Sequence, residues 1–507
     1  MVYEIHEPRV VIVGGGLVGL SAALFLRYHG VAVTLVERRV TTSPQPKARR
    51  VNIRTMELFR QIGIAEEVFA AAADLAEFQA MAAGPTLAEA ERLPFTLPGG
   101  VPEWDTITPT AACLCAQDTL EPVLRRLGEE RGADIRFGVE CVEFTEDATG
   151  LHVTLRSADG SMSVMRAAWL IAADGAASPI RRRLGIARSG RGSLGRAVNV
   201  YFRADLSDAV RGREFNLCQI ENPVTPGAFL SVDGRYRWIF STAVDIDRPA
   251  DDWAEVVREA LGVPDAHPEI LSVLTWEPGM FVADAYRSGR VFLTGDAAHV
   301  MPPYAAAGAN TGIQDAHNLS WKLGWVLRGD ANPTLLDSYH TERHPTGWHI
   351  ADQSSIRTPD LRRMTTDSTD GTPLADPIAL ILGTRYATGA LVPDGSPHTM
   401  TRLDLHGQPG TRLPHRFSTD GRSTLDLIGT DFVLLTGPDG EAWQSARQSV
   451  HVHALDESWC YTVDVERSGA VLVRPDQIIA WRVETLPHDP GGAVRHVLGD
   501  VTSAHRR

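Results

Sequence analysis

The sequence predicts an α/β protein built from a nucleotide-binding domain, a β-rich domain and a small C-terminal α/β domain. Three observations lead to this fold class. A strand, a glycine turn and a helix open the chain, an aromatic hairpin pattern lies in its middle, and a separate set of apolar strands follows a polar stretch near its end. The length of 507 residues fits this division, since domains commonly hold about 100–200 residues.

The composition narrows the class of protein. Hydrophobic residues make up 43% of the chain and charged residues 22%, which is ordinary for a globular protein. The formal net charge of −14 gives no overall attraction to nucleic acid or to anionic membranes. We find no uncharged run long enough for a bilayer span, no secretory signal pattern, and only five scattered cysteines. We therefore expect a cytoplasmic protein without nucleic-acid or membrane partners.

The first predicted element is a buried strand at residues 9–13, which leads into a G-x-G-x-x-G turn and an apolar helix. A second strand at 31–37 ends in a glutamate. In this βαβ context the glycines permit close approach of a pyrophosphate to the helix N-terminus, and the glutamate can accept hydrogen bonds from a ribose. The residues predicted to bind a nucleotide here are Gly14, Gly16, Leu17, Val18, Gly19, Glu37 and Arg38.

A second copy of the glycine pattern occurs at residues 190–195. It follows an arginine-rich segment instead of an apolar strand, and no helix pattern follows it. We interpret it as a flexible connection, so the sequence predicts no second Rossmann unit for a nicotinamide cofactor.

Residues 197–245 are predicted to be rich in β-strands. Asp233 and Gly234 predict a hairpin with a two-residue turn. Tyr236, Trp238 and Phe240 then share one face of the following strand by the period-2 rule. Two interpretations stay open: these rings form the floor of a pocket for a flat substrate, or they are ordinary core packing.

Two later strands are predicted to end in a carboxylate, Asp174 and Asp296, where ligands gather beyond the strand ends of an α/β sheet. A loop at 301–310 follows the second strand, and a helix is predicted from Thr311 onward. Residues 352–400 are polar and read as a wrapping connection, after which apolar strands predict the third domain. His340 and His344 suggest a metal site, but their spacing lacks the H-E-x-x-H pattern, so we predict no metal.

With these motifs in order, the sequence resembles the class A flavoprotein monooxygenases, a family of FAD-dependent aromatic hydroxylases that includes bacterial aromatic polyketide and chlorophenol hydroxylases. The resemblance implies that the glycine turn and Glu37 bind the adenosine diphosphate part of FAD, and that Asp296 holds the ribityl chain. Departures from the family pattern are Ala177 in place of arginine, and Ala305 and Ala306 in place of glycines. The other positions carried over are Lys47, Gln117, Asp174, Gly308, Ala309 and Asn310 at the flavin, with Pro303 on the substrate side.

The resemblance also implies domain boundaries. The FAD-binding domain is expected to be discontinuous, and the tail is expected to resemble a thioredoxin-like domain that lacks the C-x-x-C motif of dithiol chemistry. The expected segments are 1–75, 105–185 and 282–395 for the FAD-binding domain, 76–104 and 186–281 for the substrate-binding domain, and 400–507 for the thioredoxin-like C-terminal domain.

The activity implied is that of an FAD-dependent, NAD(P)H-consuming monooxygenase that hydroxylates a phenolic or polycyclic aromatic substrate with O2 through a flavin hydroperoxide. The nicotinamide is expected to bind transiently, and the protein to be a monomer or a homodimer. Two alternatives stay open: Baeyer–Villiger oxygenation on the same scaffold, or a flavin-binding protein that handles an intermediate without hydroxylating it. The residue that would deprotonate the substrate cannot be identified from the sequence.

Overall fold

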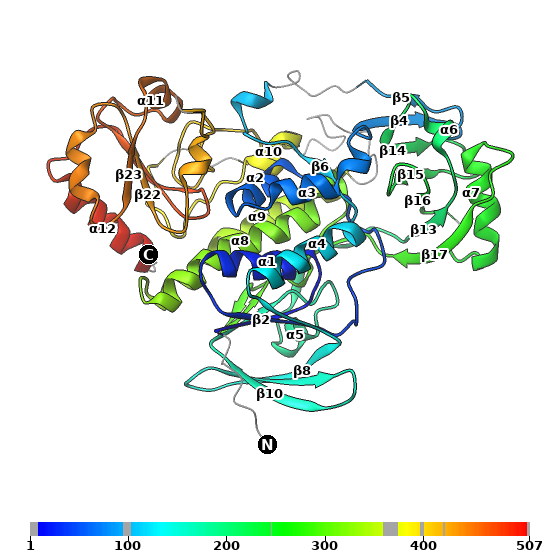
Figure 1. Ribbon diagram of the computed structural model, residues 1–507, viewed down its shortest axis with the longest axis horizontal. Coiled ribbons are helices and arrows are strands. Elements are labelled where there is room, and N and C mark those ends of the chain that lie inside the picture. The colour runs from blue at the N-terminus through cyan, green and yellow to red at the C-terminus, as the bar shows by residue number, and fades with distance from the viewer. Residues whose placement is uncertain are drawn as a thin grey trace.

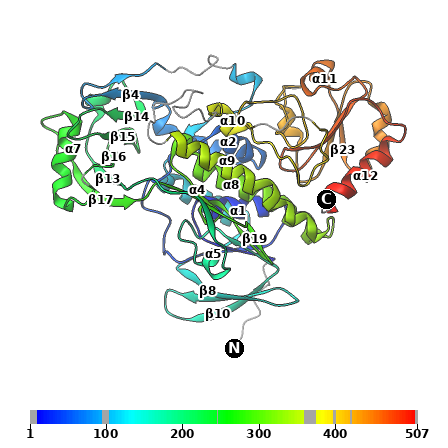
Figure 2. The same cartoon turned by 180° about the vertical axis from the view of Figure 1, so that it is seen from behind.

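The computed structural model describes residues 9–94, 103–244, 246–357, 374–395, 400–418 and 421–503. The molecule has a central lobe that holds the N-terminal βαβ unit, with the β-rich lobe on one side and the C-terminal lobe on the other (Figure 1). The view from behind shows the long helix α8 (Ala307–Arg328) running through the central lobe toward the C-terminal lobe (Figure 2).

The central lobe is built on a six-stranded sheet with the order β19-β20-β11-β1-β2-β7. All neighbours pair in parallel except β19, which pairs antiparallel with β20. Most of these strands are continuous apolar runs, as expected for a parallel sheet covered on both faces, and α1 packs against α4 and α8 beside them. The bounds are β1 Val10–Val13, α1 Leu17–Tyr28, β2 Val33–Glu37, α4 Gln117–Glu130, β7 Asp134–Phe137, β11 Trp169–Ala172, β19 Arg287–Ser288 and β20 Val291–Leu293.

The β-rich lobe is a seven-stranded sheet with the order β17-β13-β16-β15-β14-β4-β5. One face carries large apolar side chains, including Phe202 and Phe229, that pack with Trp253 of α7 (Trp253–Leu261). The opposite face is turned toward the central lobe, where Tyr201 and Ile239 pack against Ala116. The strands are β4 Ala80–Gly84, β5 Glu91–Arg92, β13 Ala197–Arg203, β14 Phe215–Ile220, β15 Gly227–Ser231, β16 Arg237–Thr242 and β17 Glu269–Trp276.

The C-terminal lobe holds a four-stranded sheet with the order β23-β22-β24-β25. Its core on one side includes Trp443 and also Trp321 of α8, so this lobe shares a hydrophobic cluster with the central lobe. A second cluster on the other side of the sheet includes Trp459. The elements are β22 Val433–Thr436, β23 His451–Ala454, α11 Glu457–Val463, β24 Ala470–Val473, β25 Ile479–Val483 and α12 Pro490–Ser503.

Smaller elements complete the fold. A three-stranded sheet, β10-β9-β8, lies at the end of the central lobe, and β12-β18-β21 and β3-β6 join the lobes. Within the described residues no helix is long and apolar enough to cross a membrane. These elements are β3 Arg50–Val51, α2 Ile53–Gln61, α3 Ala65–Ala71, β6 Cys113–Leu114, β8 Val139–Glu146, β9 Leu151–Ser157, β10 Met162–Ala167, α5 Pro179–Arg183, β12 Arg188–Ser193, α6 Ser207–Val210, β18 Gly279–Ala283, β21 His299–Val300, α9 Asp337–Arg357 and α10 Pro377–Leu382.

The structure corrects three predictions of local structure. The segment expected to be a flexible connection forms β12, which pairs antiparallel with β18 so closely that a Cβ on Gly190 would lie 2.4 Å from the Met280 carbonyl oxygen. The hairpin turn spans residues 233–236 instead of two residues, because Asp233 Oδ1 accepts hydrogen bonds from three successive backbone N–H groups. Helix α8 begins at Ala307, so the predicted loop ends earlier than expected.

Candidate active site

The turn between β1 and α1 accepts only glycine at two positions. Gly14 has φ +115°, and a Cβ there would lie 2.2 Å from the Ala173 carbonyl oxygen. A Cβ on Gly19 would lie 1.9 Å from the Gly14 oxygen. Gly16 is the N-cap of α1 and offers no side-chain acceptor, so the N–H groups of the first turn, which includes Leu17 and Val18, stay available. This cradle fits a pyrophosphate.

Glu37 closes the same turn from the end of β2. Its Oε2 accepts a hydrogen bond from Gly15 N at 2.7 Å, and its Oε1 accepts one from Arg39 N at 2.9 Å. Burial alone would raise the pKa of Glu37, but these hydrogen bonds and the Arg39 guanidinium hold it below its usual value. The carboxylate is therefore charged and fixed beside the glycine turn, while the side chain of Arg38 is exposed.

Asp174 follows β11, and its backbone lies against the glycine turn. Its Oδ2 accepts a hydrogen bond from Ile180 N at 3.0 Å, which caps α5. Its Oδ1 is buried and has no partner within the described part of the chain. Burial raises the pKa of Asp174, and hydrogen bonds, the one from Ser178 first among them, offset part of this effect. The free oxygen can accept a further hydrogen bond from a ligand.

Asp296 stands just past β20, where Gly295 turns the backbone at φ +58°. Its side chain is exposed. The surrounding protein reduces its hydration and raises its pKa, while His299 and Lys47 act in the opposite direction. Lys47, from a distant segment, is therefore near enough to Asp296 to influence its pKa. Gln117 lies beside this segment, since its backbone N–H donates to the Ala48 carbonyl oxygen at 2.7 Å.

A buried ionic cluster behind Asp296 was not predicted. Asp315 of α8 accepts hydrogen bonds from Gly295 N at 3.2 Å, from His299 Nε2 at 2.6 Å and from Arg343 Nε at 2.7 Å. Burial would raise the pKa of Asp315, but His299 and Arg343 lower it below the usual value. The charged Asp315 thus fixes the turn that carries Asp296. A partial sequence signal existed, because His299 follows the strand end at Asp296 and Asp315 lies in the helix predicted from Thr311, but only the fold shows that they meet Arg343.

The start of α8 is joined to two other segments through Asn310. Its Oδ1 accepts a hydrogen bond from Asn52 N at 3.0 Å, and its Nδ2 donates to the carbonyl oxygens of Arg50 at 2.9 Å and Ala306 at 2.7 Å. Gly308 and Ala309 lie in the first helical turn and are partly buried, whereas Pro303 is exposed. Ala306 is the N-cap and has the left-handed φ of 53°, which is uncommon for alanine.

The aromatic residues predicted to line a substrate pocket do not share one exposed face. Trp238 and Phe240 are fully buried in the core between the sheet and α7, which corresponds to the packing interpretation. Tyr236 lies outside the strand, in the hairpin loop, and is 40% exposed. Trp238 and Phe240 share one face as the period-2 pattern predicts, and that face is the one covered by α7.

The opposite face of this sheet meets the central lobe through polar contacts. Arg49 Nη1 donates to the Ser231 carbonyl oxygen at 2.6 Å, and Gln45 Nε2 donates to Ser272 Oγ at 3.0 Å. Because Gln45 and Arg49 flank Lys47, this face lies beside the segment that carries the predicted flavin contact.

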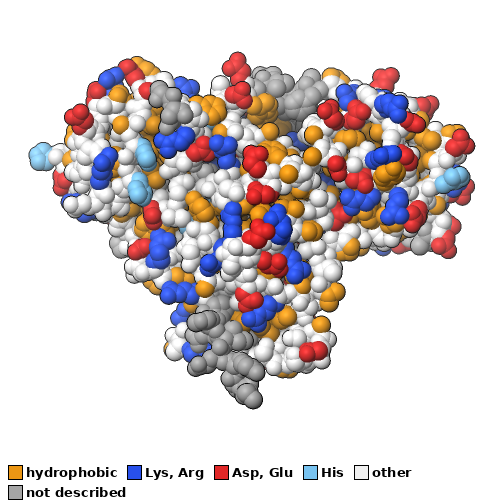
Figure 3. Space-filling view, in the orientation of Figure 1, with side chains coloured by type: hydrophobic (Ala, Val, Ile, Leu, Met, Phe, Trp, Pro, Cys, Tyr) orange, Lys and Arg blue, Asp and Glu red, His pale blue; other side chains and the backbone are white. Residues whose placement is uncertain are grey.

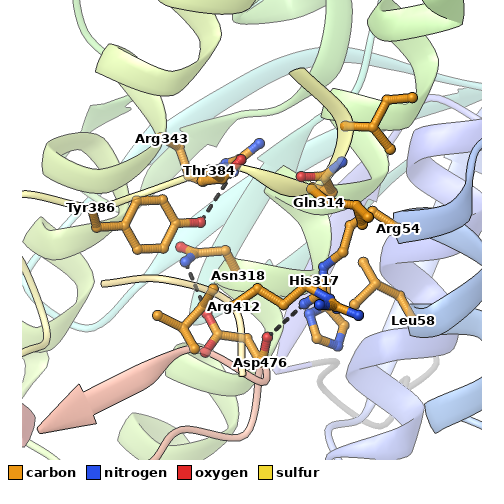
Figure 4. Close-up of a pocket in the computed structure, with 13 residues that line it drawn as sticks. Arg54, Leu58, Gln314, His317, Asn318, Arg343, Thr384, Tyr386, Arg412 and Asp476 are labelled. Carbon is orange, nitrogen blue, oxygen red and sulfur yellow. Dashed lines mark hydrogen bonds between the residues drawn. The ribbon is translucent and has the colours of Figure 1, made fainter. Parts of the chain in front are cut away.

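The C-terminal lobe reaches the same helices from the other side. A small polar cavity lies between α2, α8, α9 and the C-terminal lobe (Figure 4). Arg54 of α2 donates to the Asp476 carbonyl oxygen at 3.0 Å, and Arg412 contacts Glu57 of α2 through two hydrogen bonds. The tail therefore holds the helix whose N-cap, Asn52, is joined to Asn310.

This geometry defines the class of protein. The family model described as "FAD binding domain" matches residues 7–354, and the model "Aromatic-ring hydroxylase, C-terminal" matches residues 406–501. The chain belongs to the FAD-dependent aromatic-ring hydroxylases, and it is an FAD-dependent aromatic monooxygenase.

Particular relatives support this assignment. The tetracenomycin A2 monooxygenase-dioxygenase of Streptomyces glaucescens is 40% identical over 97% of this chain and 96% of its own length. The structure of aklavinone-11 hydroxylase in ternary complex with FAD and aklavinone matches with a TM-score of 0.87 and 32% identity over 99% of this chain and 100% of the other. The flavin-dependent monooxygenase PieE, in complex with FAD and substrate, matches with a TM-score of 0.87 and 33% identity over 98% and 99%.

The residues present fit FAD. Two glycines that no side chain can replace, an uncapped helix N-terminus and a charged, fixed Glu37 form the expected cradle for the adenosine diphosphate part. Oδ1 of Asp174, which has no partner among the described residues, and the exposed Asp296 lie at the ends of the neighbouring strands β11 and β20. We therefore assign FAD as the cofactor.

Proposed function

We propose that this enzyme consumes NAD(P)H and O2 to hydroxylate a phenolic or polycyclic aromatic substrate of the polyketide type. The observation that carries the proposal is the position of the inner, partly exposed face of the seven-stranded sheet. Hydrogen bonds from Gln45 and Arg49, residues on either side of Lys47, hold this face beside the expected flavin site. The names of the relatives support the substrate class, since one acts on tetracenomycin A2 and another was solved with aklavinone bound.

The chain's own residues position the reactants. FAD, when bound, supplies the electron transfer and the activation of oxygen. Glu37 and the glycine turn hold one end of the cofactor, and Asp296, fixed through Asp315, holds its middle. The first turn of α8 has no side-chain cap, so its N–H groups and dipole can stabilise negative charge at the flavin edge.

The surface of the enzyme fits a small neutral or weakly charged substrate better than a polyanion. On the face shown in Figure 3, acidic and basic side chains are interspersed and form no basic stripe. The net charge of −14 acts in the same direction. A substrate is therefore selected by local contacts, not by a long-range field.

The test is NADH and NADPH oxidation by the purified holoenzyme against a panel of phenols and hydroxylated anthraquinones, followed by NMR of the product. We expect a yellow protein that releases FAD on heating, and a substrate that accelerates anaerobic flavin reduction at least about tenfold, equal to about 1.4 kcal/mol of barrier. An NMR spectrum with a ring-expanded ester would instead establish Baeyer–Villiger oxygenation. Reduction that no aromatic compound accelerates would contradict the proposal.

A further inference from the structure

One amide side chain on the inner sheet face is held in a single orientation. Asn199 of β13 pairs across the sheet with Ser241 of β16 and with Leu274 of β17. Ser241 Oγ donates a hydrogen bond to Asn199 Oδ1 at 2.8 Å, and Trp276 Nε1 donates to the same oxygen at 3.0 Å. An indole N–H can only donate, so the amide cannot flip without losing this bond.

The other end of this amide therefore presents hydrogen-bond donors. With Oδ1 occupied by two donors, the two N–H groups of Asn199 Nδ2 point away from Ser241 and Trp276. Within the described residues no protein atom accepts a hydrogen bond from Nδ2, although the side chain is only partly buried. The donor is thus available to a molecule that lies on this face.

Apolar side chains border this donor on the same face of the sheet. Ile239 and Leu230 pair with each other in the next cross-strand row, and Ala228 pairs with Ser241 in the same row as Asn199. Leu230 and Leu274 are only partly buried, so the sheet face has uncovered apolar surface beside the Asn199 amide, with a second amide, Gln219, opposite Ala228 in the same row. A planar aromatic molecule that covered this face would bury the amide, and an unpaired buried donor costs free energy. Such a ligand must offer an acceptor.

The path of the chain connects the end of the sheet at Trp276 to the loop at residues 301–310, which is expected to lie at the flavin edge. Trp276 ends β17, and β18 begins at Gly279. In turn β18 pairs with β21, where Phe281 lies opposite Val300. The loop that contains Pro303 follows directly after Val300. The Asn199 amide therefore lies at the end of the sheet from which the chain continues, through β18 and its neighbour β21, to the loop beside the predicted flavin site.

From these contacts we propose that Asn199 Nδ2 is a subsite for a ring oxygen, such as a quinone carbonyl or a phenolate, of a planar polycyclic substrate. The inference rests on the proposed function, because it assigns a recognition group to the substrate of that reaction. Asn199 binds the substrate, and Trp276 is a positioning residue that acts through it.

The experiment compares two soluble ligands that differ only in ring carbonyl oxygens, anthraquinone-2-sulfonate and anthracene-2-sulfonate. Binding to the FAD-loaded full-length enzyme is measured by isothermal titration calorimetry at pH 8. Asn199→Asp keeps the acceptor for Trp276 and Ser241 but replaces the donor with a second acceptor oxygen. We expect the affinity for the quinone to fall at least tenfold, and the affinity for the anthracene to change less than threefold.

Matched variants separate the donor from the fold. Ser241→Ala leaves the Trp276 bond in place and should keep the preference for the quinone, while Asn199→Leu should abolish it even if Asn199→Asp fails to fold. An equal change for both ligands in either Asn199 variant overturns the subsite. If the wild-type enzyme binds neither ligand, the subsite is overturned. NAD(P)H oxidation with other aromatic substrates then shows whether the proposed function survives.

Discussion

Replacing Arg412 with methionine should loosen the C-terminal lobe from the FAD-binding domain. Arg412 is 1% exposed, and its Nε and Nη2 contact Glu57 of α2 at 2.8 and 2.5 Å. Nη2 also donates to the Ile107 carbonyl oxygen at 2.8 Å. Methionine keeps much of the side-chain volume but removes every one of these hydrogen bonds.

The magnitude follows from what remains around Glu57. Burial would raise the pKa of Glu57, and Arg412 is the largest influence that lowers it, followed by Arg54. Arg54 Nη1 at 2.9 Å and Thr108 Oγ1 at 2.7 Å stay in contact after the substitution. Breaking a buried ion pair costs about 3–5 kcal/mol. Because one cation persists, we expect the lower end, about 3 kcal/mol.

The assay is urea unfolding followed by tryptophan fluorescence and by FAD release. We expect the earliest urea transition to report the separation of the C-terminal lobe. With a dependence of about 1–3 kcal/mol per M urea, the midpoint of this transition should fall by about 1–3 M. Arg60 is the matched control, because it bridges the same interface by an exposed pair with Asp426 at 2.8 Å. Arg60→Met should cost less than about 1 kcal/mol. If Arg412→Met shifts the midpoint no further than Arg60→Met, the reasoning is refuted.

Three further predictions concern the cofactor, acid stability and the flavin-edge loop. Asp296→Ala should lose FAD affinity while its circular dichroism spectrum stays unchanged, and normal FAD titration would show that this residue does not hold the cofactor. Burial lowers the pKa of His29 to about 3, and neither ring nitrogen has a hydrogen-bond partner within the described chain. The buried ring is therefore neutral in the folded protein but gains a proton below about pH 6.5 in the unfolded chain. The free energy of unfolding should accordingly be unaffected by this residue above about pH 6.5 and should fall as the pH drops toward 3. At about 1.4 kcal/mol per pH unit the loss reaches roughly 5 kcal/mol over this range. His29→Leu should flatten the pH dependence of urea unfolding between about pH 6.5 and 4, and an unchanged slope would contradict this assignment. Ala306→Gly relieves the strain of a left-handed alanine, which costs about 1–2 kcal/mol. We expect the loop at residues 301–310 to become more mobile and the enzyme to release more peroxide per NAD(P)H consumed. Equal peroxide from variant and parent would show that Ala306 serves only in packing.

The motifs at strand ends could be predicted because their chemistry is local. Gly19 is required by the Gly14 oxygen within the same turn, and Glu37 acts within the same βαβ unit, whereas the atom that excludes a side chain at Gly14 belongs to Ala173 after the distant strand β11. The expectation that Lys47 and Asp296 both lie at the flavin came from the family resemblance, since nothing in the spacing brings residues so far apart together.

The errors have physical causes that a linear pattern does not contain. Alternation showed that Trp238 and Phe240 share a face, but it could not show that α7 covers that face. The segment around Gly190 is a strand because β18 lies beside it, not because of its own propensity. Asp315, Arg343 and His299 converge only when α8 and α9 pack behind the central sheet.

The antiparallel pair formed by β12 and β18 has a consequence for protein engineering. The chain enters the β-rich lobe through β12 and leaves it through β18, and Ser193 lies directly opposite Gly279. Entry and exit are therefore adjacent, so the block between them can be exchanged between relatives at one paired junction. A working chimera must also carry β4, because this strand pairs in parallel with β14 inside the same sheet. Substrate range could then be transferred as a cassette of two segments while the cofactor half stays unchanged.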